Sequence, residues 1–122
     1  MEEIKLRAWC GDRNAMYQNV GYKKHINGFS VLPYDSITGD ELGWMYSKSH
    51  KLDTMQYTGL KDKNGIEIYE GDIVTTSIET VWDVGEVIFR NTAFRVHGYI
   101  LCQLKDIEVI GNRYENPELN LT

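Results

Sequence analysis

The chain has 122 residues, of which 42% are hydrophobic and 25% are charged, a balance typical of one soluble globular domain and unlike that of disordered, collagen-like or membrane proteins. Its formal net charge is -5, and the acidic excess is uneven: residues 1–60 carry seven basic and seven acidic side chains, whereas residues 61–122 carry six and eleven. Because nucleic-acid binding depends on clustered lysine and arginine, this charge argues against a nucleic-acid partner, above all in the second half.

The first half of the chain shows short β-strand patterns separated by polar segments. Apolar and charged side chains alternate over residues 4–9 with the period of two that is typical of a half-buried strand. The turn residues that follow, at 10–14, indicate a hairpin that returns along 15–17. Residues 19–28 are polar and glycine-containing, so we expect a loop there before a short strand at 29–32.

Helical patterns are almost absent. Residues 35–53 fit both a short helix and a loop, and within them 42–46 have the pattern of a short strand. No segment shows the apolar spacing of a three-turn amphipathic helix. The sequence therefore predicts a mainly β protein.

The second half is more regular than the first. Asn64 and Gly65 fit a type I′ hairpin turn, in which both central residues adopt positive φ. Short strands at roughly ten-residue spacing favour a small barrel, because curling removes exposed edges. Asn116 followed by Pro117 predicts one helical turn near the carboxyl terminus. The predicted strands of this half are 55–60, 66–69, 73–76, 85–90, 93–97 and 107–110.

Alternation within these strands predicts which side chains fill the barrel. Side chains two positions apart share a face, so the apolar set points inward and the charged set outward. The predicted interior residues are Ile73, Val87, Phe89, Phe94, Val96 and Val109. The predicted outer-face residues are Glu86, Arg90, Arg95 and His97.

Several segments of the chain resemble the YopX family of bacteriophage and prophage proteins. The central segment is MQYTGLKDKNG at residues 55–65, which runs on to IYEGDIV at 68–74. LRAW at 6–9 is similar to the amino-terminal strand of that family, and IEVIGNRYENPEL at 107–119 is similar to its closing segment. One position departs from the pattern: Cys10 stands where the family commonly has an aspartate.

The resemblance implies a phage or prophage origin in a bacterial host, and a fold with two parts. Residues 1–54 would form a β-rich, less regular portion, and residues 55–122 an SH3-like barrel with a carboxyl-terminal tail, the two packed as one compact unit. The resemblance implies no activity, so no functional residue is carried over from the family. Small barrels host many unrelated roles, and function has to be argued from a site.

The cysteine content and the amino terminus indicate a cytoplasmic protein. A secreted domain of this size that relied on disulfides would usually carry more cysteines than Cys10 and Cys102. The chain begins without a basic and apolar leader, and no stretch approaches the length of a membrane span. We therefore expect reduced thiols, a cytoplasmic location and no membrane partner.

No motif has the spacing of a catalytic, cofactor or metal site. Cys10 and Cys102 lack the close spacing of zinc ligands, and His25, His50 and His97 are far apart in the sequence. A cysteine nucleophile at Cys10 would need one of these histidines close in space, and we interpret Cys10 as a turn residue instead. The sequence thus predicts a non-enzymatic protein without cofactor or metal.

Aromatic residues carry the strongest functional signal, at 11% of the chain. Tyr57, Tyr69, Trp82 and Tyr114 lie beside turn or acidic residues, where rings favour a partner surface. The alternative is that these rings cover the junction between the two halves of the chain. We therefore predict a protein-interaction module that binds a protein partner or a second copy as a homo-oligomer; the alternative function is a nucleic-acid-associated phage protein.

Overall fold

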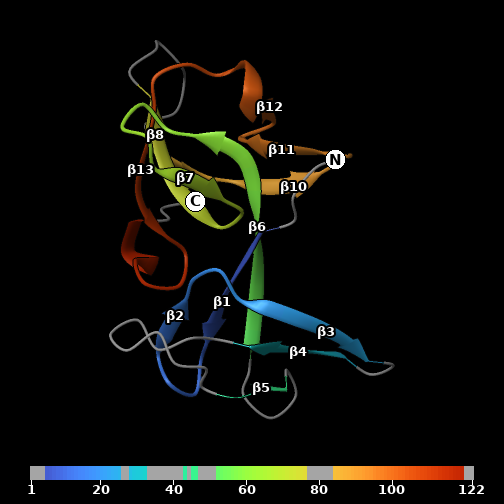
Figure 1. Cartoon of the computed structure of the whole chain (residues 1–122). Helices are drawn as coiled ribbons and strands as arrows, with labels where there is room; N and C mark the ends of the chain where they lie inside the picture. Colours follow the sequence, from blue (N-terminus) through green and yellow to red (C-terminus); the bar gives the residue numbers. More distant parts are fainter. Residues whose placement is uncertain are drawn as a thin grey trace. The chain divides into compact units, whose positions relative to one another are not determined.

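The computed structural model describes residues 5–25, 28–32, 43, 45–46, 52–76 and 84–119 (Figure 1). Within these residues the regular structure is strand apart from two short 3₁₀ helices, so the predicted mainly β fold is confirmed. The chain divides into two compact units, residues 1–56 and 57–122. The strands that lie within the first unit are β1 (Leu6–Cys10), β2 (Ala15–Tyr17), β3 (Gly21–His25), β4 (Gly28–Leu32) and β5 (Met45–Tyr46).

Strand β6 (Leu52–Lys61) begins in the first unit and continues into the second. The elements that follow it are β7 (Glu67–Tyr69), β8 (Asp72–Thr76), β9 (Val84–Glu86), β10 (Ile88–Arg90), β11 (Ala93–Val96), β12 (Tyr99–Ile100), the 3₁₀ helix η1 (Leu101–Gln103), β13 (Ile107–Asn112) and the 3₁₀ helix η2 (Pro117–Leu119).

Strand β1 is the central strand of the first unit. It forms the predicted hairpin with β2 on one side, and on the other side it pairs antiparallel with the start of β6, where Cys10 lies opposite Leu52. Alternation along β1 buries Ala8 and Cys10 completely. These two residues form a small apolar core with Val20 and Leu52.

The prediction of a loop at 19–28 is wrong. Strand β3 occupies most of this segment and pairs with β4 from Gly21 opposite Leu32 to His25 opposite Gly28. The polar residues and glycines of this segment have a low propensity for β-strands, so the sequence does not indicate a strand. The strand forms because β4 provides its hydrogen bonds. Strand β5 pairs with the other edge of β4.

Segment 35–53 is described only at residues 43, 45–46 and 52–53. Strand β5 confirms a short strand within the predicted 42–46. The choice between a helix and a loop for the rest of this segment falls outside the described residues.

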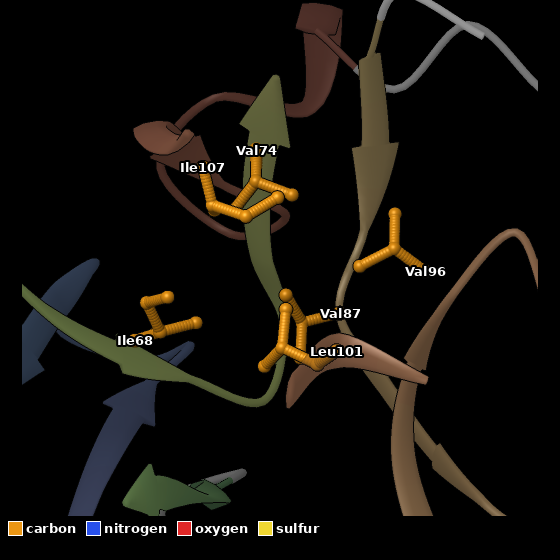
Figure 2. Packing of buried hydrophobic residues seen from close by; sticks show 6 residues of the cluster. All are labelled: Ile68, Val74, Val87, Val96, Leu101 and Ile107. Carbon is orange, nitrogen blue, oxygen red and sulfur yellow. The ribbon is translucent and has the colours of Figure 1, made fainter. Parts of the chain in front are cut away.

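The second unit combines several short antiparallel pairings. The later part of β6 pairs with β7, β8 lies between β13 and β9, and β10, β11 and β12 form a meander. Figure 2 shows six buried side chains that converge from these elements into a common core: Ile68, Val74, Val87, Val96, Leu101 and Ile107. Closure of these sheets into an SH3-like barrel stays a prediction.

Asp62 organises the turn between β6 and β7. Its Oδ1 accepts hydrogen bonds from the N–H groups of Asn64 at 2.8 Å and Ile66 at 2.9 Å. Its Oδ2 accepts another from the N–H of Val109 in β13 at 2.9 Å. Gly65 has φ of +82° but Asn64 does not have positive φ, so the type I′ turn predicted at these two residues is wrong. Asp62 and Ile66 flank a three-residue loop instead: the N–H of Asp62 donates to the carbonyl of Ile66 at 2.7 Å, and the N–H of Gly65 donates to the carbonyl of Asp62 at 3.0 Å.

Most of the predicted interior residues of the second unit are confirmed. Ile73, Val87 and Val96 are completely buried. Phe94 and Val109 are partly buried and pack against the common core. The success for Phe94 and Val96 has a simple reason: they lie two positions apart on β11, where alternation places them on one face of the sheet.

The prediction for Phe89 is wrong, because its side chain is 54% exposed. The predicted strand 85–90 is two strands, β9 and β10, which belong to different sheets. Val87 separates them: its N–H donates to the carbonyl of Asp72 at 2.9 Å, and its carbonyl accepts from the N–H of Gly71 at 2.8 Å. Phe89 therefore belongs to the meander, where it shares a face with Phe94, but its place on an outer strand leaves its ring exposed to solvent.

The carboxyl-terminal segment ends in the predicted helical turn, which is η2. The N–H of Leu119 donates to the carbonyl of Asn116 at 3.0 Å, and Pro117 occupies the first helical position, where no N–H is required. The side-chain oxygen of buried Asn112 accepts from the N–H groups of Tyr114 at 3.0 Å and Glu115 at 2.9 Å. The side chain of Asn112 thereby holds the turn that leads into η2.

Candidate functional site

Two tight turns shape the meander of β10, β11 and β12. Asn91 and Thr92 connect β10 to β11 with φ of +51° and +64°, and His97 and Gly98 connect β11 to β12 with φ of +51° and +85°. Positive φ at both central residues defines the type I′ turn, whose twist suits an antiparallel hairpin. Sequence reasoning missed both turns, because neither pair is the Asn-Gly signature that led to the prediction at 64–65.

The meander carries aromatic rings that reach solvent. Phe89 lies directly opposite Phe94, and their ring centroids are 5.0 Å apart in an edge-on arrangement. Tyr99 lies opposite the fully buried Val96 and is 48% exposed, close to the 54% of Phe89. Cross-strand partners share a face of the sheet, so all four side chains belong to one face. On this face Val96 is buried in the core, whereas Phe89 and Tyr99, on the two outer strands of the meander, are exposed. We call Phe89, Phe94 and Tyr99 the aromatic edge.

The charge of this region differs from that of the chain as a whole. Residues 87–105 contain no aspartate or glutamate, although residues 61–122 hold eleven of the 18 acidic side chains. The same stretch contains Arg90, Arg95, His97 and Lys105. The meander is therefore a basic and aromatic element within an acidic protein.

The two arginines of the meander have different roles. The Nε of Arg95 donates to the carbonyl of Arg90 at 3.0 Å, and its Nη1 donates to the carbonyl of Gly98 at 3.2 Å. Arg95 therefore ties the two type I′ turns together and is a structural residue. Arg90 is exposed.

A small pocket of about 280 Å³ lies beside the end of β12. Its apolar lining includes residues of the common core, and its polar lining includes lysine, aspartate and the exposed thiol of Cys102. None of the lining residues is a histidine, so the thiol has no imidazole base within the pocket. The lining residues are Leu60, Lys61, Asp62, Lys63, Ile68, Leu101, Cys102, Leu104, Asp106 and Ile107.

The aromatic residues predicted to form a partner surface have separate environments. Tyr69 is only 3% exposed and belongs to the interior, so this part of the prediction is wrong. Tyr57 is partly buried with its ring centroid 5.5 Å from that of Tyr69. Tyr114 is also partly buried, and the guanidinium of Arg113 lies 5.4 Å from its ring centroid. Trp82 lies outside the described residues.

The residues considered for nucleophilic chemistry have structural surroundings. Cys10 is the last residue of β1, paired with Ala15 and Leu52, and is completely buried in the core of the first unit, so its interpretation as a turn residue is wrong. The Nε2 of His97 lies 2.9 Å from the carbonyl oxygen of Val84. The side chain of His25 and all of His50 fall outside the described structure.

Two further observations concern metal ions and membranes. Among the residues that the structure describes, no three histidine, cysteine or acidic side chains gather where they could hold a metal ion. The described part of the chain also contains no helix with the length and apolar character needed to cross a membrane.

Comparison with known proteins gives the fold and the family. The crystal structure of protein EF1440 from Enterococcus faecalis is similar to this chain, with a TM-score of 0.67 and 23% sequence identity over 98% of this chain and 99% of that one. At this level of identity the likeness establishes a shared fold only. No curated protein matches the chain. The YopX protein family matches residues 5–120, nearly the whole length, and the chain therefore belongs to the YopX family.

Proposed function

We propose that this chain is a non-enzymatic protein-interaction module, encoded by a phage or prophage and acting in the cytoplasm of the bacterial host. The aromatic edge is the surface through which it binds its partner. The observation that carries the proposal is Phe89, which is 54% exposed although it lies on the core-facing side of a β-sheet. Exposing a large ring to water is unfavourable, and exposed aromatic rings in a polar surrounding are typical of interaction surfaces.

The backbone beside this ring supports the proposal. Thr92, at the tip of the β10–β11 hairpin, has φ of +64°, a conformation that is rare for a β-branched residue and costs free energy. Strained backbone of this kind is concentrated at functional sites, where it presents neighbouring side chains in a fixed geometry. Here the nearby residues of β10 are Arg90, next to the turn, and Phe89, which precedes it.

A nucleic-acid partner is the second candidate function. The acid-free stretch 87–105 with its arginines and exposed rings favours it, since aromatic rings stack on bases and guanidinium groups bind phosphate. The charge of the rest of the chain opposes it, because the chain as a whole carries a net charge of -5. Protein binding is therefore the leading function.

Photo-crosslinking tests the proposed function. A benzophenone amino acid is placed at position 89 in one variant and at position 22 in another, because Tyr22 is similarly exposed at 50% but lies in the first unit. Both variants are irradiated in cells that carry the natural gene. We expect a discrete protein adduct from position 89, including an adduct with a second copy if the chain self-associates, and none from position 22.

The purified partner then decides the outcome. Binding that is lost in Phe89→Ser and retained in Tyr22→Ser supports the proposal. Adducts that are the same from both positions, or adducts from position 89 that contain nucleic acid and no protein, would overturn it. Folding of both variants is checked by circular dichroism, because neither side chain is needed for the core.

A further inference from the structure

Among the described residues, no strand pairs with the outer edge of β10, which lies next to the aromatic edge. In a hairpin with a two-residue turn, the two residues that flank the turn exchange both of their backbone hydrogen bonds, and the next pair exchanges none. Arg90 and Ala93 flank the Asn91-Thr92 turn, and Phe89 and Phe94 are the next pair. The N–H and carbonyl of Phe89 therefore point away from β11, and β10 is an outer strand of its sheet among the described residues.

Backbone groups of this kind accept an additional strand. An extended peptide that lies along such an edge pairs with its N–H and carbonyl groups, and its side chains then determine specificity. Along β10 those side chains would meet the ring of Phe89 on one face of the sheet and Arg90 on the other, because successive residues of a strand face opposite sides. The ligand would thus be apolar on one face and negatively charged on the other.

We propose that β10 binds an extended acidic segment of a partner protein as an additional β-strand, with carboxylates facing Arg90 and apolar side chains against Phe89. This inference rests on the proposed function and names the chemistry of its partner. The stretch 87–105 contains no acidic side chain that would repel such a segment. Charge complementarity of this kind contributes mainly to specificity and to the rate of association.

The charge count favours an acidic peptide over a nucleic acid. Arg95 already donates to two carbonyl groups, so few cations remain for phosphates, whereas a protein that holds a nucleic acid by its backbone typically makes about 6–10 phosphate contacts. A long polyanion would also reach the acidic remainder of the chain. A short acidic segment confines its charge to the meander.

The distribution of charge also argues against the binding of a second copy of the chain at this edge. Two β10 strands paired about a two-fold axis would bring together two acid-free meanders, each with an exposed Arg90. Repulsion between like charges would weaken such a pair. An acidic segment from a different protein has no such penalty.

Nuclear magnetic resonance titration of the full chain tests the proposal. The probe is a short peptide in which glutamate alternates with threonine, and its control has glutamine at every glutamate position. We expect the glutamate peptide to shift the backbone amide signals of residues 88–100, and the glutamine peptide to bind about tenfold more weakly, as a few exposed ion pairs would produce.

Charge-reversal variants give the matched comparison. Arg90→Glu should abolish the shifts, whereas Arg13→Glu, which changes the net charge equally at an exposed turn of the first unit, should leave them unchanged. Equal binding of both peptides, or shifts outside the meander, would overturn the acidic-strand inference while a crosslink at position 89 still upheld protein binding. Larger shifts with oligothymidylate would assign the surface to nucleic acid, and shifts that depend on protein concentration alone would assign it to a second copy.

Discussion

At the residue scale, Thr92 is the position where side-chain type and backbone conformation conflict most directly. Its φ of +64° places a β-branched residue in the left-handed region, where the Cβ atom crowds the following carbonyl. The neighbouring Asn91, with φ of +51°, is of a type that tolerates this region. The type I′ turn is therefore imposed on Thr92 by pairing of β10 with β11.

Thr92→Gly is expected to stabilise the protein. Glycine adopts positive φ without strain, and this gain exceeds the extra freedom of glycine in the unfolded chain, for a net increase of about 0.5–1 kcal/mol in the free energy of unfolding. Urea denaturation measures the change. Thr92→Ala is the control, because alanine keeps the Cβ atom and should give no such gain. A glycine variant less stable than wild type would contradict the assignment of this turn.

The ionisation of Asp62 matters for the fold. Burial by itself would raise the pKa of Asp62, but hydrogen bonds from the N–H groups of Val109, Ile66 and Asn64, together with the nearby Lys63 ammonium, outweigh it and hold the pKa below its ordinary value of 3.8. The carboxylate is only 7% exposed. The folded state therefore favours the ionised form of Asp62. This carboxylate joins the β6–β7 turn to β13.

The pH dependence of stability follows from the downward shift of the Asp62 pKa. A lowered folded-state pKa means that the stabilisation by Asp62 is complete above the unfolded-state pKa and is lost as the pH falls below it toward the folded-state value. Asp62→Asn should lower the free energy of unfolding at neutral pH by about 1–3 kcal/mol, since one acceptor oxygen becomes a donor. Denaturation at a series of pH values should show this difference shrinking below about pH 4. A difference that stayed constant down to acid pH would contradict the role of the charge.

At the element scale, β9 and β11 approach each other so closely that a side chain on β9 is excluded. A Cβ atom added to Gly85 would lie 2.5 Å from Cγ1 of Val96 and 2.6 Å from Cδ2 of His97. Val96 belongs to the common core and is completely buried. The glycine thus permits β9 to pack against the end of β11.

Gly85→Ala is expected to destabilise the protein by about 1–3 kcal/mol, because the added methyl group overpacks a buried contact. Thermal denaturation measures the effect. Gly21→Ala is the matched control, since its added Cβ would meet nothing closer than Cβ of Leu32 at 3.7 Å, and it should cost little. An unchanged melting temperature for Gly85→Ala would show that β9 and β11 are not packed as described.

At the scale of the whole molecule, each unit has its own apolar core, and the aromatic edge lies at the margin of the larger one. Ile68 is 1% exposed within that core, whereas Phe89 is 54% exposed on the outermost strand of the meander. The size of a side chain therefore does not by itself decide how much it stabilises the fold, because only the apolar area that is removed from water contributes. Phe89 occupies a position where the fold gains little from it, which is consistent with the proposed binding role.

Paired alanine substitutions test this distribution of stability. Ile68→Ala should lower the free energy of unfolding by about 2–5 kcal/mol, as expected for truncation in a core, and Phe89→Ala by less than about 1 kcal/mol, as for a surface site. Urea denaturation of both variants gives the comparison. If Phe89→Ala cost as much as Ile68→Ala, the ring would be buried and the aromatic edge would lose its role.

Much of the architecture could be predicted from the sequence. The alternation in β1 and β11, the short strand at 29–32 and the Asn116-Pro117 helical turn are local patterns, and the structure confirms them where it describes them. The absence of helical periodicity was sufficient to predict a mainly β fold. The acid-free stretch 87–105 is also visible in the sequence, although only its place on one meander shows its meaning.

The sequence alone determined the mainly β character of the chain and its family. The tertiary structure decided the features that depend on contacts between different segments of the chain. Strand β3 needs β4 for its hydrogen bonds, and the Asp62 carboxylate selects the turn at 62–66. The exposure of Phe89 is the third such feature. The physical reason is the same in each case. Local alternation fixes which residues share a face, but hydrogen bonds between distant segments, such as those of Val87 with Gly71 and Asp72, decide which sheet a strand joins and whether it lies at the edge of that sheet.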